Sequence, residues 1–111
     1  MMWTRMMKGK FISVLLMLPT IADAGFYDGN RMLENCRERT AFVSTGFAAG
    51  ILDTLQLDNQ TDWKICPPAS ITAGQARDVM CKHLEDNPAS RHQSAAFLGW
   101  QSFYEAWPCP N

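Results

Sequence analysis

The sequence is poor in the residues from which most catalytic and metal sites are built. It holds only two histidines, His83 and His92, and its four cysteines include no C-x-x-C pair. A nucleophilic enzyme needs a Cys or Ser beside a base, and a structural zinc site needs closely spaced thiols or histidines. We therefore expect no catalysis, no bound metal and no cofactor. His83 is expected to be a partly exposed helix residue, and His92 to lie in a turn and bond backbone carbonyls.

The chain also lacks an excess of positive charge. It carries 10 Lys and Arg against 11 Asp and Glu, a formal net charge of −1 at pH 7. Nucleic acids and anionic membrane surfaces are bound through clustered basic residues, so neither is an expected partner. A mildly acidic surface suits a protein partner or solubility alone, and the composition leaves both open.

The longest apolar run is too short to cross a membrane. It covers residues 11–18, whereas a membrane-spanning helix needs about 20 apolar residues. A basic segment precedes this run, and the small residues Ala22 and Ala24 follow it, which is the order found in a secretory signal peptide. We predict a signal peptide over 1–24, cleavage after Ala24, and a periplasmic protein without a stable membrane anchor.

The basic residues of that first segment are Arg5, Lys8 and Lys10.

Cleavage would leave one domain, residues 25–111, which is small enough that extra cross-links often supplement its hydrophobic core. The cysteines supply these cross-links, since Cys36, Cys66, Cys81 and Cys109 all follow the cleavage site. An even number of cysteines in an exported chain indicates two disulfides, each worth roughly 2 to 4 kcal/mol. Their connectivity stays open at this point.

The exported part has a helical pattern, because apolar residues recur at three and four and no β-branched run is long enough for a strand. We predict an all-α fold, a compact bundle of about four helices stapled by disulfides. The expected helices cover 30–39, 40–57, a third that opens with a capping box at Thr72 to Gln75 and stops before Asn87-Pro88, and 94–106. Asn30 is the expected N-cap of the first helix.

Two helices carry further expectations. The second should place its apolar residues on one face, and its Gly46 and Gly50 suggest that another helix packs closely there. That face consists of Phe42, Val43, Phe47, Ile51 and Leu55. In the last helix a heavy aromatic face is expected to be core rather than a ligand site: Phe97, Trp100, Phe103, Tyr104 and Trp107.

Polar residues offer few candidates for a binding site. Asp53 is either a solvated carboxylate, which is favoured, or one paired with Arg77 or Arg91. The long connection after the second helix is more distinctive, since Trp63 lies beside Asp58 and Asp62. An aromatic anchor on a tethered polar loop is typical of a protein interface, although the ring would equally well fold back onto the core.

The order of these features resembles the Rap/Tai immunity proteins, which are exported antidotes of bacteria that use type VI secretion. The first half contributes Gly29-Asn30 with Leu33 and Cys36, then Gly46-Phe47 and Gly50 with Asp53. The second half is more specific: Cys66-x-Pro68, Ile71-Thr72-x-x-Gln75-x-x-Asp78-Val79, Leu84-x-x-Asn87-Pro88, Arg91-His92, Ala95-Ala96 and Ala106-Trp107-Pro108-Cys109. The similarity spans nearly the whole exported part.

The chain departs from the family pattern in its cysteines. Ser44 stands where a Cys usually precedes the Gly-aromatic pair by two residues, and Cys81 is additional. With this departure, the resemblance implies disulfides between Cys36 and Cys81 and between Cys66 and Cys109. The first pairing is also similar to the single bridge of small acid-stress chaperones of the HdeA type.

The resemblance implies a function as a non-enzymatic inhibitor. Such proteins bind a peptidoglycan amidase delivered into the periplasm by type VI secretion and block its active site. Asp58, Asp62 and Trp63 are the candidate effector-binding residues. The alternative is a periplasmic acid-stress chaperone that binds many clients. A homodimer is compatible with either function.

Overall fold

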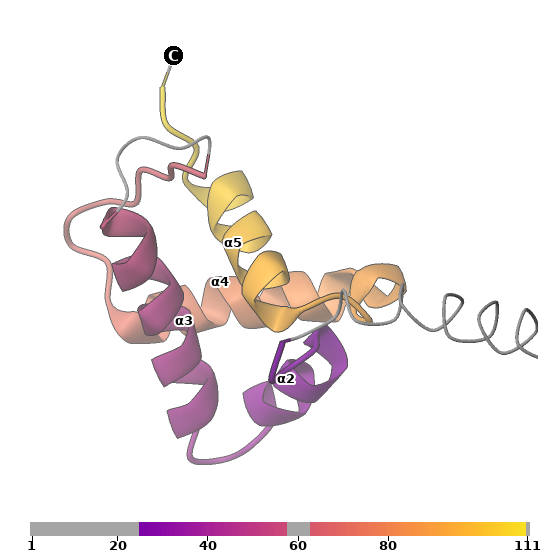
Figure 1. Ribbon diagram of the computed structural model, residues 1–111. Helices are drawn as coiled ribbons and strands as arrows, with labels where there is room; N and C mark the ends of the chain where they lie inside the picture. The colour runs from indigo at the N-terminus through magenta and orange to yellow at the C-terminus, as the bar shows by residue number, and fades with distance from the viewer. Residues whose placement is uncertain (1–24, 58–62, 111) are drawn as a thin grey trace, which may run out of the picture.

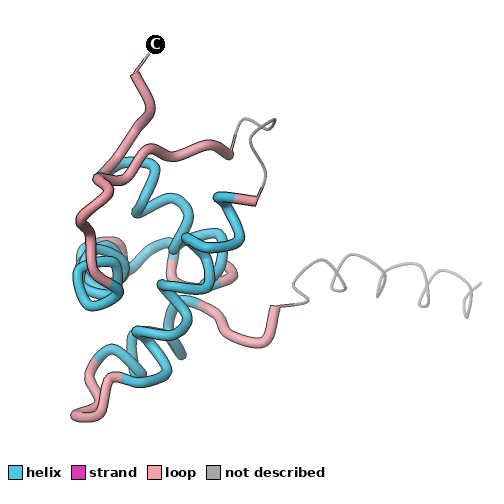
Figure 2. The backbone as a smooth tube through the Cα atoms, turned by 90° about the vertical axis from the view of Figure 1, so that its left-hand side faces the viewer, coloured by secondary structure: helices cyan, strands magenta, loops and turns pink. Residues whose placement is uncertain are grey.

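The protein is all-α in the part that the structure describes. The computed structural model describes residues 25–57 and 63–110, so the predicted signal peptide lies outside it. Four α-helices and one short 3₁₀ helix follow one another within these ranges (Figures 1 and 2). They are α2 (Gly29–Cys36), α3 (Phe42–Gln56), α4 (Ala73–Asp86), η2 (Pro88–Ser90) and α5 (Ala95–Ala106). The predicted fold class is confirmed.

Helix α4 is the centre of the arrangement. It packs against α2, α3 and α5, and it runs across the back of the other helices in Figure 1. The buried side chains between these four helices form one apolar cluster. Its members are Met32, Leu33, Ala48, Leu52, Ala76, Met80, Leu84, Ala95, Leu98 and Phe103.

Local hydrogen bonds fix both ends of α4. The Gln75 amide donates to the Thr72 hydroxyl oxygen at 3.1 Å, and the Thr72 amide donates to the Gln75 side-chain oxygen at 2.8 Å. This is the predicted capping box, which satisfies two amides that the helix cannot. The helix ends at Asp86, ahead of Asn87-Pro88, as expected.

The start of α2 differs from the prediction. Its N-cap is Asp28, whose carboxylate accepts a hydrogen bond from the Arg31 amide at 2.8 Å, and Asn30 lies inside the helix. Asn30 does not cap because it lies inside the helix, which begins at Gly29; its amide donates to the carbonyl of Arg91 at 3.0 Å. Gly29 comes equally close to this turn, since a Cβ on Gly29 would lie 2.8 Å from the same carbonyl oxygen. Glycine at this position lets the two segments meet.

Two disulfides connect distant parts of the chain. Cys36 at the end of α2 is bonded to Cys81 on α4, and Cys66 is bonded to Cys109 beyond the end of α5. This is the connectivity that the family resemblance implied. The second bridge is supported by a hydrogen bond from the Cys66 amide to the carbonyl of Trp107 at 2.9 Å. The segment that follows residue 63 is therefore fixed to the end of α5.

Arg77 on α4 connects three helices, α2, α3 and α4. Its Nε donates to the Ser44 hydroxyl oxygen at 3.0 Å, and one terminal nitrogen donates to the Cys36 carbonyl at 2.6 Å. Its remaining terminal nitrogen pairs with Asp78 at 3.0 Å.

Asp53 is exposed, so the favoured interpretation of that carboxylate as solvated is confirmed.

The residues that α3 buries most fully are not those of its predicted apolar face. Phe42 is 80% exposed, and the residues of α3 that are buried against the rest of the domain are Ser44, Ala48 and Leu52. The difference arises because apolar residues occur nearly all round α3, so their spacing does not select one face. The helix also begins two residues later than expected, after Ala41 in a left-handed conformation with φ 53°.

Within the described ranges, no helix is long and apolar enough to cross a membrane.

Candidate functional site

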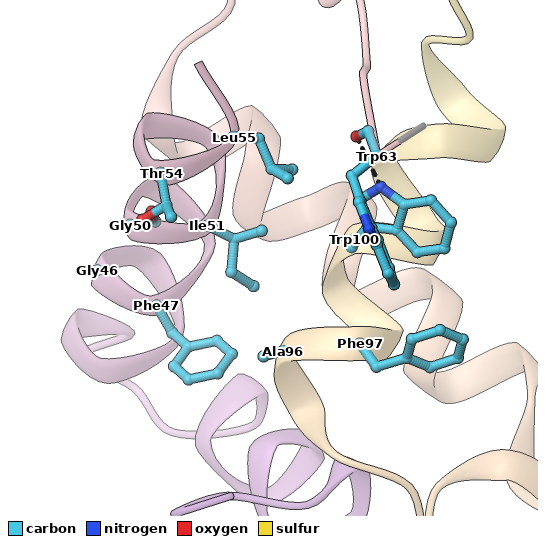
Figure 3. A pocket seen from close by; sticks show the side chains of 10 residues that line it. All are labelled: Gly46, Phe47, Gly50, Ile51, Thr54, Leu55, Trp63, Ala96, Phe97 and Trp100. Atoms are coloured by element: carbon cyan, nitrogen blue, oxygen red, sulfur yellow. Dashed lines mark hydrogen bonds between the residues drawn. The ribbon is translucent and has the colours of Figure 1, made fainter. Parts of the chain in front are cut away.

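An open apolar groove of about 700 Å³ lies between α3 and α5 (Figure 3). Helix α3 forms one wall and helix α5 the other, with Trp63 beside Trp100 on the α5 side. None of the described residues that line it is charged. They are Gly46, Phe47, Gly50, Ile51, Thr54, Leu55, Trp63, Ala96, Phe97 and Trp100.

Apolar side chains on α3 point across the groove. Phe47, Ile51 and Leu55 follow one another at four-residue spacing and project toward α5 in Figure 3. Each is partly exposed rather than buried. The ring of Phe47 is held from behind by an edge-to-face contact with Tyr27, at 5.9 Å between ring centroids. Phe47 and Ile51 also pack against the core cluster, so this wall of the groove borders the core.

Two glycines, Gly46 and Gly50, lie on the same wall. A Cβ built on Gly46 or on Gly50 would meet no atom of the described residues within 4 Å. The expectation that another helix of this domain packs against these glycines is therefore wrong for the part that the structure describes. A different glycine serves that purpose: a Cβ on Gly99 of α5 would lie 2.5 Å from the Cδ1 atom of Ile51. Helices α3 and α5 thus approach each other closely at Gly99, which is buried.

A row of aromatic rings is centred on Trp100, and three of them, Trp63, Phe97 and Trp100, line the groove. Its ring centroid lies 4.5 Å from that of Trp63, 5.7 Å from Phe97 and 5.3 Å from Tyr104. Trp63, Phe97 and Tyr104 are 48%, 38% and 45% exposed. These partly exposed rings are placed as the anchors of a protein interface usually are, accessible but fixed by their neighbours.

The aromatic face of α5 therefore divides into two. Phe103 is fully buried in the core and stacks on the half-buried Trp107, as predicted for the whole face. Phe97, Trp100 and Tyr104 follow at helical spacing on the neighbouring face and look outward. The prediction of a core function is wrong for these three. Helical periodicity shows which residues share a face, but a twelve-residue helix can present two aromatic faces to different surroundings.

Trp63 joins the loop to the groove. Its carbonyl oxygen accepts a hydrogen bond from the Trp100 indole nitrogen at 2.9 Å, shown as a dashed line in Figure 3. The residue folds back onto α5 and leaves about half of its surface exposed, and its function as an interface anchor stays a prediction. Of the three predicted effector-binding residues, Asp58 and Asp62 lie outside the described residues.

The polar groups of the groove walls are used within the protein. The Thr54 hydroxyl donates to the carbonyl of Gly50 at 2.8 Å, and the Trp100 indole nitrogen is bonded to Trp63. Neither side chain is free to act as an acid, a base or a nucleophile on a substrate. The groove offers shape and apolar surface, which suit binding and not chemistry.

The two histidines lie outside the groove lining. His83 on α4 is more buried than expected, with 9% of its side chain exposed and its Nδ1 3.5 Å from a carboxylate oxygen of Glu105. His92 is exposed in the turn before α5. Over residues 25–57 and 63–110, no group of three or more His, Cys, Asp or Glu side chains could hold a metal ion.

These observations define a disulfide-linked helical binding protein. The chain belongs to the Rap1a immunity protein family, whose model matches residues 28–109, from the N-cap of α2 to the last cysteine. Neither the curated proteins nor the solved structures include a match to this chain. Members of an immunity family are not enzymes, and each acts by binding a cognate toxin. The family and the two disulfides together indicate a protein that acts outside the cytoplasm.

Proposed function

We propose that this protein binds and inhibits a peptidoglycan amidase delivered by type VI secretion, and that it thereby protects the cell that makes it. The observation that carries the proposal is the family match, which includes every described helix and both disulfides. The motifs from Cys66 to Cys109 resemble those of Rap/Tai antidotes to amidases. The same evidence favours this function over an acid-stress chaperone.

The proposed mechanism is steric occlusion of the amidase active site. The loop that carries Asp58, Asp62 and Trp63 is the proposed contact surface. Trp63 is suited to this because its backbone is held by Trp100 and by the nearby Cys66–Cys109 bridge while half of the residue stays exposed. A surface fixed before binding loses less conformational entropy on association, which favours high affinity.

The proposal also gives the N-terminal segment a function. An amidase of this kind attacks the cell wall from the periplasm, so its antidote must be exported to meet it. We therefore propose that residues 1–24 are a signal peptide cleaved after Ala24, and that the two disulfides form after export.

Protection of living cells tests the export step. Cells producing a periplasm-targeted amidase should survive when they also make the full chain, and should lyse when residues 2–24 are deleted. The purified domain 25–111, oxidised in vitro, should still bind the amidase, because only the location has changed. Equal protection by the chain without its first segment would contradict the proposal that the signal peptide is needed.

Alanine substitution tests the contact surface. Replacing Asp58, Asp62 and Trp63 together should raise the concentration needed to inhibit the purified amidase by at least tenfold, as the loss of an interface anchor does. Because Trp63 also contacts Trp100, circular dichroism and the thermal midpoint must show that the variant is folded. Unchanged inhibition by a folded triple variant would remove this surface from the proposal.

A further inference from the structure

Gly46 and Gly50 are unfavourable for the helix that contains them. Glycine in a helix interior is less favourable than alanine by about 1 kcal/mol, and both residues lie within α3 (Phe42–Gln56). Neither adopts the positive φ that would require glycine. Space does not require glycine either, since a Cβ at each position would meet no described atom within 4 Å. The described domain gives no structural reason for these glycines.

The groove on which they lie has the dimensions of a helix-binding site. From Gly46 to Leu55 the wall of α3 is ten residues long, and nine rises of 1.5 Å give it a length of about 14 Å. This matches about two and a half turns of a second helix, enough for anchor side chains at i, i+3 or i+4, and i+7. The missing Cβ atoms would let the backbone of such a helix come close to α3.

The lining specifies the chemistry of the occupant. None of the described lining residues is charged, and the Thr54 hydroxyl and Trp100 indole are already bonded within the chain. A charged or strongly polar segment would lose its hydration in the groove without gaining partners. Apolar side chains would instead pack between Ile51 and Leu55 on one side and Phe97 and Trp100 on the other.

An exposed apolar surface of this kind in a soluble domain marks an interaction site. A cognate toxin is the partner that an immunity protein must bind. We propose that the groove between α3 and α5 receives an apolar helical segment of the cognate toxin, and that Gly46 and Gly50 are the positions at which that helix approaches most closely. This inference rests on the proposed immunity function, but not on which bond the toxin cleaves.

A leucine at Gly50 provides the test, because it fills the groove while the helix tolerates it. The matched control is Gln56→Leu, which adds an apolar side chain to an exposed position of the same helix outside the groove. Calorimetric titration of the oxidised domain into the toxin encoded beside its gene should show at least a tenfold higher Kd for Gly50→Leu. The control should stay within twofold of the wild type.

The thermal midpoint of each variant must be measured as well. For Gly50→Leu it should be unchanged or higher, because leucine favours the helix more than glycine does. A lower midpoint would mean that this chain itself fills the groove, and would overturn the inference.

The remaining outcomes separate this inference from the proposed function. If the wild type inhibits amidase activity and Gly50→Leu binds as tightly as the wild type, the groove is not the docking site and the function stands. If Gly50→Leu weakens binding of a toxin that is not an amidase, the result supports the groove as the docking site and contradicts the proposed function. A wild-type domain that binds no toxin overturns both. If light scattering shows a wild-type dimer that Gly50→Leu dissociates, the occupant is a second copy and not the toxin.

Discussion

Glycines in two regions of this molecule have opposite surroundings. At Gly29 a Cβ would lie within 3 Å of the backbone of Arg91, so the side-chain hydrogen is what allows α2 to meet the turn before α5. At Gly46 and Gly50 a Cβ would meet no described atom within 4 Å. In one region glycine allows two segments of the protein to come close together. In the other region the glycines lie on a surface that no described residue covers. The comparison separates a requirement of folding from a requirement of binding.

The two regions differ in the same way in their other contacts. The region around α2 and α4 is linked by the Cys36–Cys81 disulfide and by Arg77, which bonds both Ser44 and the Cys36 carbonyl. The groove between α3 and α5 has rings and aliphatic side chains that remain partly exposed. Substitutions in the closed region should change stability, whereas those in the groove should change binding.

The largest effect is expected from removing the bridge of the closed region. Replacing Cys36 and Cys81 by serine should lower the free energy of unfolding by about 4 kcal/mol, the entropy of closing a loop of 45 residues. Urea denaturation monitored by circular dichroism would measure the loss. A variant as stable as the wild type would show that the closed region does not depend on its cross-link.

Gly29→Ala should have the next largest effect. The new methyl group would clash with the end of the Leu98 side chain and also with backbone atoms of Arg91, which cannot turn aside as a side chain can, so we expect a loss of about 1 to 3 kcal/mol. The same denaturation experiment measures it. An unchanged free energy of unfolding would mean that the start of α2 can shift to make room for the methyl group. The contrast between the two regions would then disappear.

Alanine at the two groove glycines should stabilise the protein, the opposite of the effect at Gly29. Replacing Gly46 and Gly50 by alanine should raise the free energy of unfolding by about 1 kcal/mol for each residue, because alanine favours the helix and meets no described atom. A gain in stability accompanied by weaker toxin binding would sharpen the comparison. A loss of stability would place an unrecognised contact in the groove.

The smallest effect is expected at the start of α4. Thr72→Ala removes the hydroxyl that accepts from the Gln75 amide, which should cost about 1 kcal/mol and leave toxin affinity unchanged. The matched measurements are urea denaturation and calorimetric titration. A change in affinity larger than the change in stability would connect this cap to the binding surface.

Local chemistry in the sequence predicted the ends of elements best. The Thr72 and Gln75 capping box and the stop before Pro88 depend on neighbouring residues alone, and both are confirmed. The cap at the start of α2 was missed because Asp28 and Asn30 are both favoured N-cap residue types, and the hydrogen bonds that hold Gly29 and Asn30 at this helix start come from residues more than sixty positions away in the chain. A contact of that range leaves no local pattern.

The groove could not be predicted for a different physical reason. Periodicity placed Phe47, Ile51 and Leu55 on one face of α3, and the structure agrees. Whether a face is covered depends on the partner helices. Here α4 packs against α3, and the buried residues Ala48 and Leu52 of α3 lie on the neighbouring face. Glycine spacing likewise indicated a close approach at α3, but it cannot distinguish a helix of the same chain from one of another protein.

Inhibition of a purified amidase tests the central claim most directly. The oxidised domain 25–111 is titrated into the peptidoglycan amidase encoded beside its gene, and the release of cleaved peptide from peptidoglycan is followed. Activity should fall in proportion to the domain added and vanish at a fixed molar ratio, as expected for a tight antidote. Amidase activity that persists in excess of the folded domain would contradict the assignment of this protein as its inhibitor.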